Sequence, residues 1–210
     1  MKTVLAINGS PRRGGSTAQM LASALKGAQS AGAVTEIVHL SDLQFSGCTS
    51  CFACKRLGSP CFGSCGWQDE LTPVLSKILT ADAVVIGSPI YFGDVTGMVR
   101  NLTERLLFPN CLYDKDGKKA YDRRVPVGLV FTMNVPEARF YQDLTERLAE
   151  CYTHFLGPVK LAFAANTWQF DDYSKYSSSM FDVEEKRRRR EEVFPTELES
   201  AFQMGRTLLE

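Results

Sequence analysis

The sequence predicts an α/β fold in which a doubly wound, five-stranded parallel sheet carries helices on both faces. Short apolar runs alternate with segments whose apolar residues recur at helical spacing, and turns rich in Gly and Pro separate them. With 210 residues, 44% of them apolar, the chain is long enough for one sizeable core. We therefore expect one domain over 1–210, with a cysteine-rich loop at 46–66 and a C-terminal extension at 168–210.

The predicted strands are apolar runs, as expected when helices cover both faces of a parallel sheet. In order along the chain they are residues 3–7, 34–40, 83–87, 126–132 and 160–165. The helices between them are predicted from stripes of apolar residues at spacings of three and four. In order they are residues 16–28, 69–80, 97–107 and 140–155. Because the carboxyl ends of parallel strands meet at one edge, we expect a ligand site in the loops that follow them.

Charge and hydropathy exclude several classes of protein. The chain has 24 Lys plus Arg against 24 Asp plus Glu, so it lacks the cationic excess of a general nucleic-acid or membrane-surface binder. No apolar run approaches the roughly 18 residues of a membrane helix, and residues 4–7 are too short a run for a signal peptide. We therefore predict a cytoplasmic protein that binds neither nucleic acid nor membranes.

The loop after the first strand has the composition of a phosphate site. It lies where free backbone N–H groups and the helix dipole favour an anion. A nucleotide P-loop is disfavoured because Gly15 stands where that motif has lysine, and the spacing Gly-x-Gly-x-x-Gly is also missing. A single terminal phosphate fits better, although such a turn also serves simply to cap a helix. The candidate phosphate-binding residues are Ser10, Arg12, Gly15, Ser16 and Thr17.

The loop after the third strand combines a turn, aromatic rings and a glycine, which suits a flat ligand. A phosphate loop beside an aromatic loop fits flavin mononucleotide (FMN), and the loop after the fourth strand would offer polar groups to the pyrimidine edge of its ring. Ordinary loop or core packing is the alternative. The candidate ring-binding residues are Pro89, Ile90, Tyr91, Phe92, Gly93, Thr132 and Asn134.

Two motifs carry a resemblance to a known family. Gly-Ser-Pro-Arg-x3-Ser-Thr in the first loop, followed by Gly-Ser-Pro-Ile-Tyr-Phe-Gly-Asp-Val-Thr-Gly, resembles the flavodoxin-like, NADPH-dependent FMN reductases over roughly residues 3–167. The resemblance implies that Ser10, Arg12, Ser16 and Thr17 contact the FMN phosphate and that the third loop contacts the isoalloxazine. It also implies a homo-oligomer, a dimer or tetramer.

Five of the seven cysteines lie between Cys48 and Cys65. Where thiols stay reduced, such a cluster indicates a metal or redox site rather than disulfides. The spacing of Cys48, Cys51 and Cys54 resembles a run of iron-sulfur ligands, and the iron-sulfur flavoproteins of the same family imply a 4Fe-4S cluster in this loop. They favour Cys61 over Cys65 as the fourth ligand. Zinc bound by four of these thiolates, or reduced thiols without metal, are alternatives.

The basic run near the C-terminus and the two histidines are predicted to have no role in catalysis or binding. The run Lys186–Arg190 lies among glutamates, and a solvated helix with i,i+4 pairs explains it. The expected pairs are Glu184–Arg188, Glu185–Arg189 and Arg187–Glu191. The two histidines, His39 and His154, are predicted to be structural.

Together these features predict an FMN-binding oxidoreductase. NADH or NADPH, or a protein donor, would supply electrons, and a quinone, flavin or protein would accept them. The flavin carries the redox chemistry, so no catalytic side chain is named. One alternative is a non-catalytic flavin and iron-sulfur electron carrier. Another is a zinc-bearing interaction module without flavin.

Overall fold

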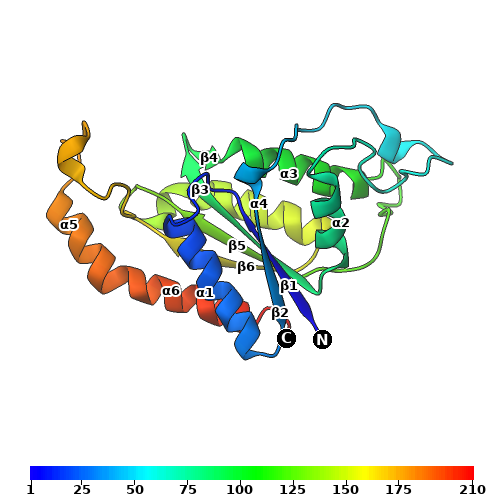
Figure 1. Ribbon diagram of the computed structural model, residues 1–210. Helices are drawn as coiled ribbons and strands as arrows, with labels where there is room; N and C mark the ends of the chain where they lie inside the picture. Colours follow the sequence, from blue (N-terminus) through cyan, green and yellow to red (C-terminus); the bar gives the residue numbers. More distant parts are fainter.

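The computed structural model describes residues 1–210 and confirms the predicted parallel sheet (Figure 1). Five parallel strands lie in the order β2-β1-β3-β5-β6. Their bounds are Thr3–Asn8 for β1, Val34–His39 for β2, Ala83–Tyr91 for β3, Val127–Thr132 for β5 and Val159–Ala164 for β6. The strand order reverses beside β1, so the loops after β1 and β3 flank the topological switch point of the sheet.

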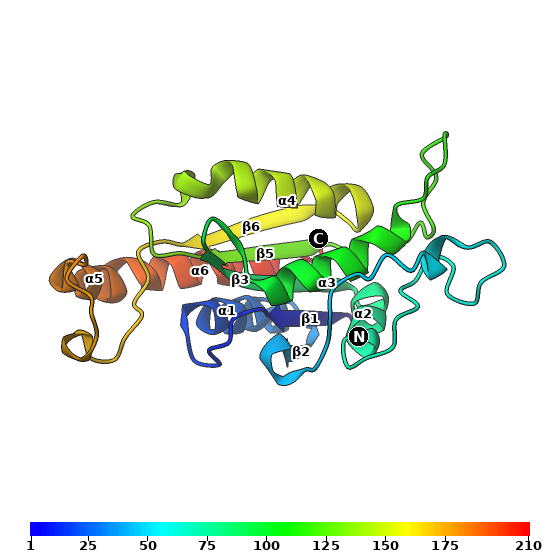
Figure 2. The ribbon, with the colours of Figure 1, turned by 90° about the horizontal axis from the view of Figure 1, so that it is seen from above.

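Helices cover both faces of the sheet, as Figure 2 shows from above. One face carries α1 and α6, and the other carries α2, α3 and α4. The bounds are Ser16–Ser30 for α1, Thr72–Thr80 for α2, Gly97–Leu107 for α3, Gln142–Phe155 for α4, Val183–Arg188 for α5 and Phe194–Arg206 for α6. A π-helical turn, Arg189–Val193, joins α5 to α6. Short 3-10 turns occupy Leu40–Asp42, Ala53–Lys55, Phe108–Asn110, Ala138–Tyr141 and Tyr173–Lys175.

Two segments differ from the sequence-based prediction. The third strand does not end at residue 87 but continues to Tyr91, where it turns back into a short antiparallel strand, β4, Asp94–Val95. The segment 168–210, set apart as an extension, contains α6, which packs on α1 and on the sheet. Its buried residues Ala201 and Met204 belong to the same apolar cluster as α1. The last helix is therefore part of the cover of the sheet.

None of the helices combines the length and the apolar character that a bilayer crossing requires.

Candidate functional site

Buried polar groups at the end of β1 order the first loop. The Asn8 amide nitrogen lies 2.9 Å from His39 Nδ1, at the end of the neighbouring strand β2. Its Oδ1 accepts a hydrogen bond from the Ser10 N–H, and the Ser10 hydroxyl accepts one from the Arg12 N–H. Each bond spans two residues, the spacing of Asx and Ser turns. His39 therefore has the structural role that the sequence predicts, and it acts through Asn8 on the phosphate loop.

Gly9 lets the first loop pass close to the loop after β3. Its N–H donates to the Gly87 carbonyl at 2.8 Å, and its own carbonyl accepts from the Thr96 hydroxyl at 2.8 Å. A Cβ at this position would lie 2.0 Å from Val99 Cγ2 and 2.8 Å from the Gly87 oxygen. Only glycine allows this approach without displacing the start of α3, so the two ligand loops are held together.

The N-terminus of α1 is available to an anion. Gly15 occupies the N-cap position, and no side chain caps the helix. The first backbone N–H groups of the helix therefore lack intrahelical partners. Hydroxyls of Ser16 and Thr17 and the guanidinium of Arg12 lie around the same turn. This donor set fits a phosphate monoester.

The chain after residue 87 forms a β-hairpin. Its tip carries two of the residues predicted to bind the ring, Phe92 and Gly93, away from the other predicted residues. Phe92 and Gly93 have φ values of 51° and 79° and form the tip, with the Phe92 side chain fully exposed. Pro89, Ile90 and Tyr91 precede the tip and face the first loop across a cavity. The hairpin therefore presents its ascending strand, rather than its tip, to that cavity.

One cavity of about 200 Å³ brings the ligand loops together at the carboxyl edge of the sheet. Phe92 and Gly93 do not line it, whereas the other predicted residues do: Ser10, Arg12, Gly15, Ser16, Thr17, Pro89, Ile90, Tyr91, Thr132 and Asn134. The hydroxyls of Thr17 and Thr132 lie 2.7 Å apart and join the first wall to the third. The arrangement fits a flat ligand that carries one phosphate.

Sequence reasoning missed a fourth wall of the same cavity. Thr167, Trp168 and Gln169 also line it. They follow β6, the strand at the end of the sheet, and the Arg12 guanidinium donates to the Gln169 carbonyl. The rule that ligands bind beyond the carboxyl ends of strands applies to β6 as well, so that rule could have found them.

Lys186 corrects the prediction of a fully solvated basic helix. It is 2% exposed. Its Nζ donates to Asn134 Oδ1 at 2.6 Å, to Asn166 Oδ1 at 2.7 Å and to the Thr167 carbonyl at 3.0 Å. Burial, aided by the charge of Arg189, lowers the pKa of Lys186 to about 8. The amine thus ties α5 to the loops after β5 and β6, which wall the cavity.

The expected i,i+4 pairs of this run are also replaced. Arg187 pairs with Glu184 at 3.0 Å and Arg188 with Glu185 at 2.6 Å, both at i,i+3 spacing. Arg189 pairs at 3.0 Å with Glu197 of α6. Arg188 also lies 3.7 Å from Glu192, an i,i+4 pair other than the three expected ones.

The cysteine-rich loop is anchored by Arg105, a fully buried residue of α3. Its guanidinium pairs with Asp69 at 2.5 Å and donates to the carbonyls of Ser46 and Trp67 at 3.1 and 3.0 Å. These partners stand at the two ends of the loop. Burial opposes ionisation of Asp69, but hydrogen bonds from Arg105 and from the Ser46 N–H outweigh it and lower the pKa of this carboxyl. Arg105 therefore closes the loop at its base.

Although it follows β2, the loop does not stay at the carboxyl edge of the sheet. It packs beside Glu104, Arg105 and Phe108, at the C-terminal end of α3, whereas Thr96, at the start of this helix, contacts the phosphate loop. The hydrogen bonds of Arg105 hold the loop in this position, and Figure 2 shows the loop running alongside α3 to the far end of this helix. The cysteines are thus separated from the cavity at the carboxyl edge of the sheet by the length of α3.

Four cysteines share one small cavity in this loop, and they are Cys48, Cys51, Cys54 and Cys65. Cys61 does not line it. The Cys65 sulfur lies 3.4 Å from Arg105 Nε. Burial raises the pKa of Cys54, and the nearby Cys65 and Cys48 act in the same direction, whereas Lys55 opposes them. No three His, Cys, Asp or Glu side chains converge as they would around a single ion.

A parallel sheet of this order, with a phosphate loop and an aromatic hairpin at its switch point, defines a flavodoxin-like mononucleotide-binding protein. The profile of the NADPH-dependent FMN reductases matches residues 2–166. The chain belongs to the NADPH-dependent FMN reductase family.

Curated relatives are iron-sulfur flavoproteins. One from Archaeoglobus fulgidus is 41% identical over 102 residues, which cover 49% of this chain and 47% of that protein. Another, from Methanocaldococcus jannaschii, is 34% identical over 102 residues, which cover 49% of this chain and 50% of that protein. The chain spans about half the length of the curated relatives it matches.

Solved structures share the fold across the whole chain. The NAD(P)H:quinone oxidoreductase from Methanothermobacter marburgensis has a TM-score of 0.67 at 14% identity, covering 99% of this chain and 96% of its own. An azoreductase from Bacillus anthracis has a TM-score of 0.66 at 12% identity, covering 98% and 99%. At these identities the likeness shows the fold.

Proposed function

We propose that this protein is an FMN-dependent oxidoreductase that takes electrons from NADH or NADPH and passes them to a quinone, a flavin or a protein acceptor. The cavity at the carboxyl edge of the sheet carries the proposal, because it joins an uncapped helix N-terminus to an aromatic hairpin. When bound, FMN supplies hydride acceptance and electron transfer. Family membership and the flavin reductase fold of its structural neighbours support the same function.

Different residues of the chain would bind the phosphate, the ring and the pyrimidine edge of FMN. Arg12, Ser16 and Thr17 would bind the phosphate, together with the free N–H groups of α1. Pro89 to Tyr91 would cover the ring. Asn134 is held through its Oδ1 by Lys186, so its amide N–H groups remain free to donate to the pyrimidine edge. These contacts would bind and orient the flavin.

Replacing Arg12 by glutamine tests the phosphate site. We expect FMN to bind roughly tenfold to hundredfold more weakly, since one charge-assisted hydrogen bond is lost, whereas riboflavin, which has no phosphate, should bind unchanged. Fluorescence titration of the apoprotein measures both affinities. Arg13→Gln is the matched control, because Arg13 pairs with Asp42 and does not line the cavity. Equal losses for FMN and riboflavin would contradict a phosphate contact.

Steady-state turnover tests the reaction itself. Oxidation of NADH or NADPH by the FMN-loaded protein, with a quinone or free flavin as acceptor, is expected for an enzyme. A non-catalytic carrier would hold FMN and show no turnover. A protein that binds zinc and no FMN would refute the proposal and support an interaction module.

We further propose that the cysteine-rich loop binds a 4Fe-4S cluster through Cys48, Cys51, Cys54 and a fourth cysteine. The iron-sulfur flavoprotein relatives support the cluster. In a 4Fe-4S cluster each cysteine binds a different iron. The cysteine sulfurs therefore lie farther apart than the ligands of a single metal ion. The half-buried Lys55, beside Cys54, and the buried Arg105, beside Cys65, would offset the charge of the thiolates. A cytoplasmic location, where thiols stay reduced, suits such a site.

The identity of the fourth ligand can be tested by paired serine substitutions. The resemblance to the iron-sulfur flavoproteins favours Cys61, but Cys65 shares the cavity with the other three thiols, which favours Cys65. We expect Cys65→Ser to lose iron and sulfide after anaerobic reconstitution, and Cys61→Ser to keep them. Iron and sulfide analysis and the low-temperature EPR signal measure both. The reverse pattern would assign Cys61, and a wild-type protein that takes up no iron would exclude the cluster.

A homo-oligomer, dimer or tetramer, is also proposed, on the ground of family membership. Light scattering of the FMN-loaded protein measures its mass in solution, and a monomer would contradict the proposal.

A further inference from the structure

A buried positive charge without a counter-charge lies behind the loop after β5, which lines the proposed flavin cavity. Lys186, in α5, is buried and makes no ion pair. Its amine donates to Asn134 Oδ1, to Asn166 Oδ1 and to the Thr167 carbonyl. A lysine ammonium has three N–H donors, so none is left to touch a ligand. Three neutral oxygens thus satisfy its hydrogen bonds and leave its charge uncompensated.

The surroundings of Lys186 do not supply a negative charge either. Glu197, in α6, pairs at 3.0 Å with Arg189 and not with Lys186. Phe181 covers the amine, and its ring centroid lies 4.8 Å from Nζ. Burial lowers the pKa of Lys186 to about 8, so the amine is still largely protonated at pH 7. Such a cation is costly to bury unless a negative charge comes to lie near it.

Asn134 connects this charge to the cavity. Its side chain lines the cavity, and the 2.6 Å bond to Lys186 fixes its Oδ1, so the amide N–H groups are left for a ligand. When a flavin ring accepts two electrons and one proton, one negative charge remains, and the pyrimidine edge shares it. A hydrogen-bond donor that is polarised by a cation stabilises this charge more than a neutral environment does.

We propose that Lys186 is a positioning residue that fixes Asn134, places a positive charge behind the pyrimidine edge of FMN, and so raises the reduction potential of the bound flavin. The inference rests on the proposed function, since it requires FMN in this cavity. Lys186 stabilises the anionic reduced ring more than the neutral oxidised ring. It gives up no proton and forms no bond to the cofactor.

Removing the charge should therefore affect the two redox states of FMN unequally. Lys186→Met keeps the length of the side chain and removes its charge. We expect reduced FMN to bind roughly tenfold to hundredfold more weakly relative to oxidised FMN, which lowers the midpoint potential by about 30–60 mV. Anaerobic titration of the FMN-loaded protein with dithionite, beside a reference dye, measures the potential. Fluorescence titration measures the affinity for oxidised FMN.

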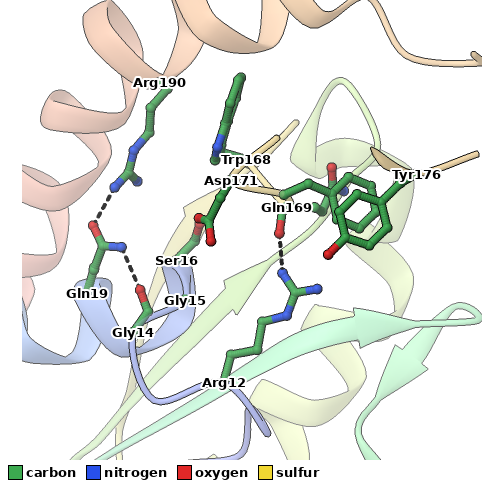
Figure 3. A pocket seen from close by; sticks show the side chains of 11 residues that line it. Arg12, Gly14, Gly15, Ser16, Gln19, Trp168, Gln169, Asp171, Tyr176 and Arg190 are labelled. Carbon is green, nitrogen blue, oxygen red and sulfur yellow. Dashed lines mark hydrogen bonds between the residues drawn. The ribbon is translucent and has the colours of Figure 1, made fainter. Parts of the chain in front are cut away.

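A merely structural role of Lys186 would give a different result. The segment that its amine holds continues from Thr167 to Gln169, whose carbonyl accepts from the Arg12 guanidinium (Figure 3). Loosening of this segment would weaken oxidised and reduced FMN alike and would leave the potential unchanged. Lys186→Gln is a second variant, because it keeps N–H donors without the charge. It should lower the potential as Lys186→Met does, with a smaller loss of stability in urea unfolding.

The matched control is Lys160→Met, which removes the same charge near the start of β6, at the opposite edge of the sheet. Lys160 is exposed, and its amine donates to the Thr207 hydroxyl at 2.8 Å. The control should keep the wild-type potential. An unchanged or higher potential in the Lys186 variants, or an equal fall in the control, would overturn the inference. A wild-type protein that binds no FMN would instead refute the proposed function, so the two failures are distinguishable.

Discussion

Replacing Gly205 by alanine is expected to lower the free energy of unfolding by about 2–3 kcal/mol, the upper range for overpacking. A Cβ on Gly205, in α6, would lie 1.9 Å from the backbone oxygen of Ala24 in α1. Gly27 of α1 makes the reciprocal contact, since a Cβ there would lie 2.0 Å from the Phe202 oxygen. Backbone atoms cannot rotate away as a flexible side chain can, so the helices must separate.

Separation of α1 from α6 would expose apolar surface and disturb the helix whose N-terminus forms the phosphate site. Urea unfolding of the FMN-free protein measures the change. Gly97→Ala is the matched control, because Gly97 begins α3 and no atom lies within 4 Å of a Cβ built on it. We expect that control to change stability by less than about 0.5 kcal/mol. Equal stabilities for the two variants would show that the last helix is not held by close packing.

Replacing Arg105 by methionine is expected to cost about 3 kcal/mol of folding free energy, because it leaves the Asp69 carboxylate without its buried counter-charge. The side chains of Arg105 and Asp69 are 0% and 13% exposed, so little solvent screens the pair. The substitution also removes hydrogen bonds to the carbonyls of Ser46 and Trp67. The base of the cysteine-rich loop should then open.

The matched control is Arg100→Met, on the same helix. Arg100 pairs with Asp94 at 2.6 Å, but these side chains are 41% and 46% exposed, and surface pairs contribute only about 0–1 kcal/mol. Urea unfolding compares the two variants, and limited proteolysis compares cleavage between residues 46 and 69. A similar cost for both substitutions, with no new cleavage, would mean that Arg105 does not anchor the loop.

The sequence by itself determined the parallel sheet and the position of the ligand edge. These follow from local patterns: apolar runs define buried strands, helical spacing defines the connections, and the order of elements restricts the topology. The phosphate loop was predictable for the same reason, since Ser10, Arg12, Ser16 and Thr17 lie within one short segment of chain. The family motif in these loops led to the expectation of FMN.

Only the tertiary structure decided which distant residues meet. Trp168 and Gln169 join the flavin cavity because β6 ends beside β5. Lys186 is buried although its neighbours in sequence are charged, because its amine finds three oxygens on other loops. Cys65 lies with the first three cysteines because Arg105 folds back the end of their loop. Such pairings depend on long-range contacts that leave no periodic signal in the sequence. A charged side chain is buried only where polar partners surround it, and its neighbours in sequence do not show whether such partners exist.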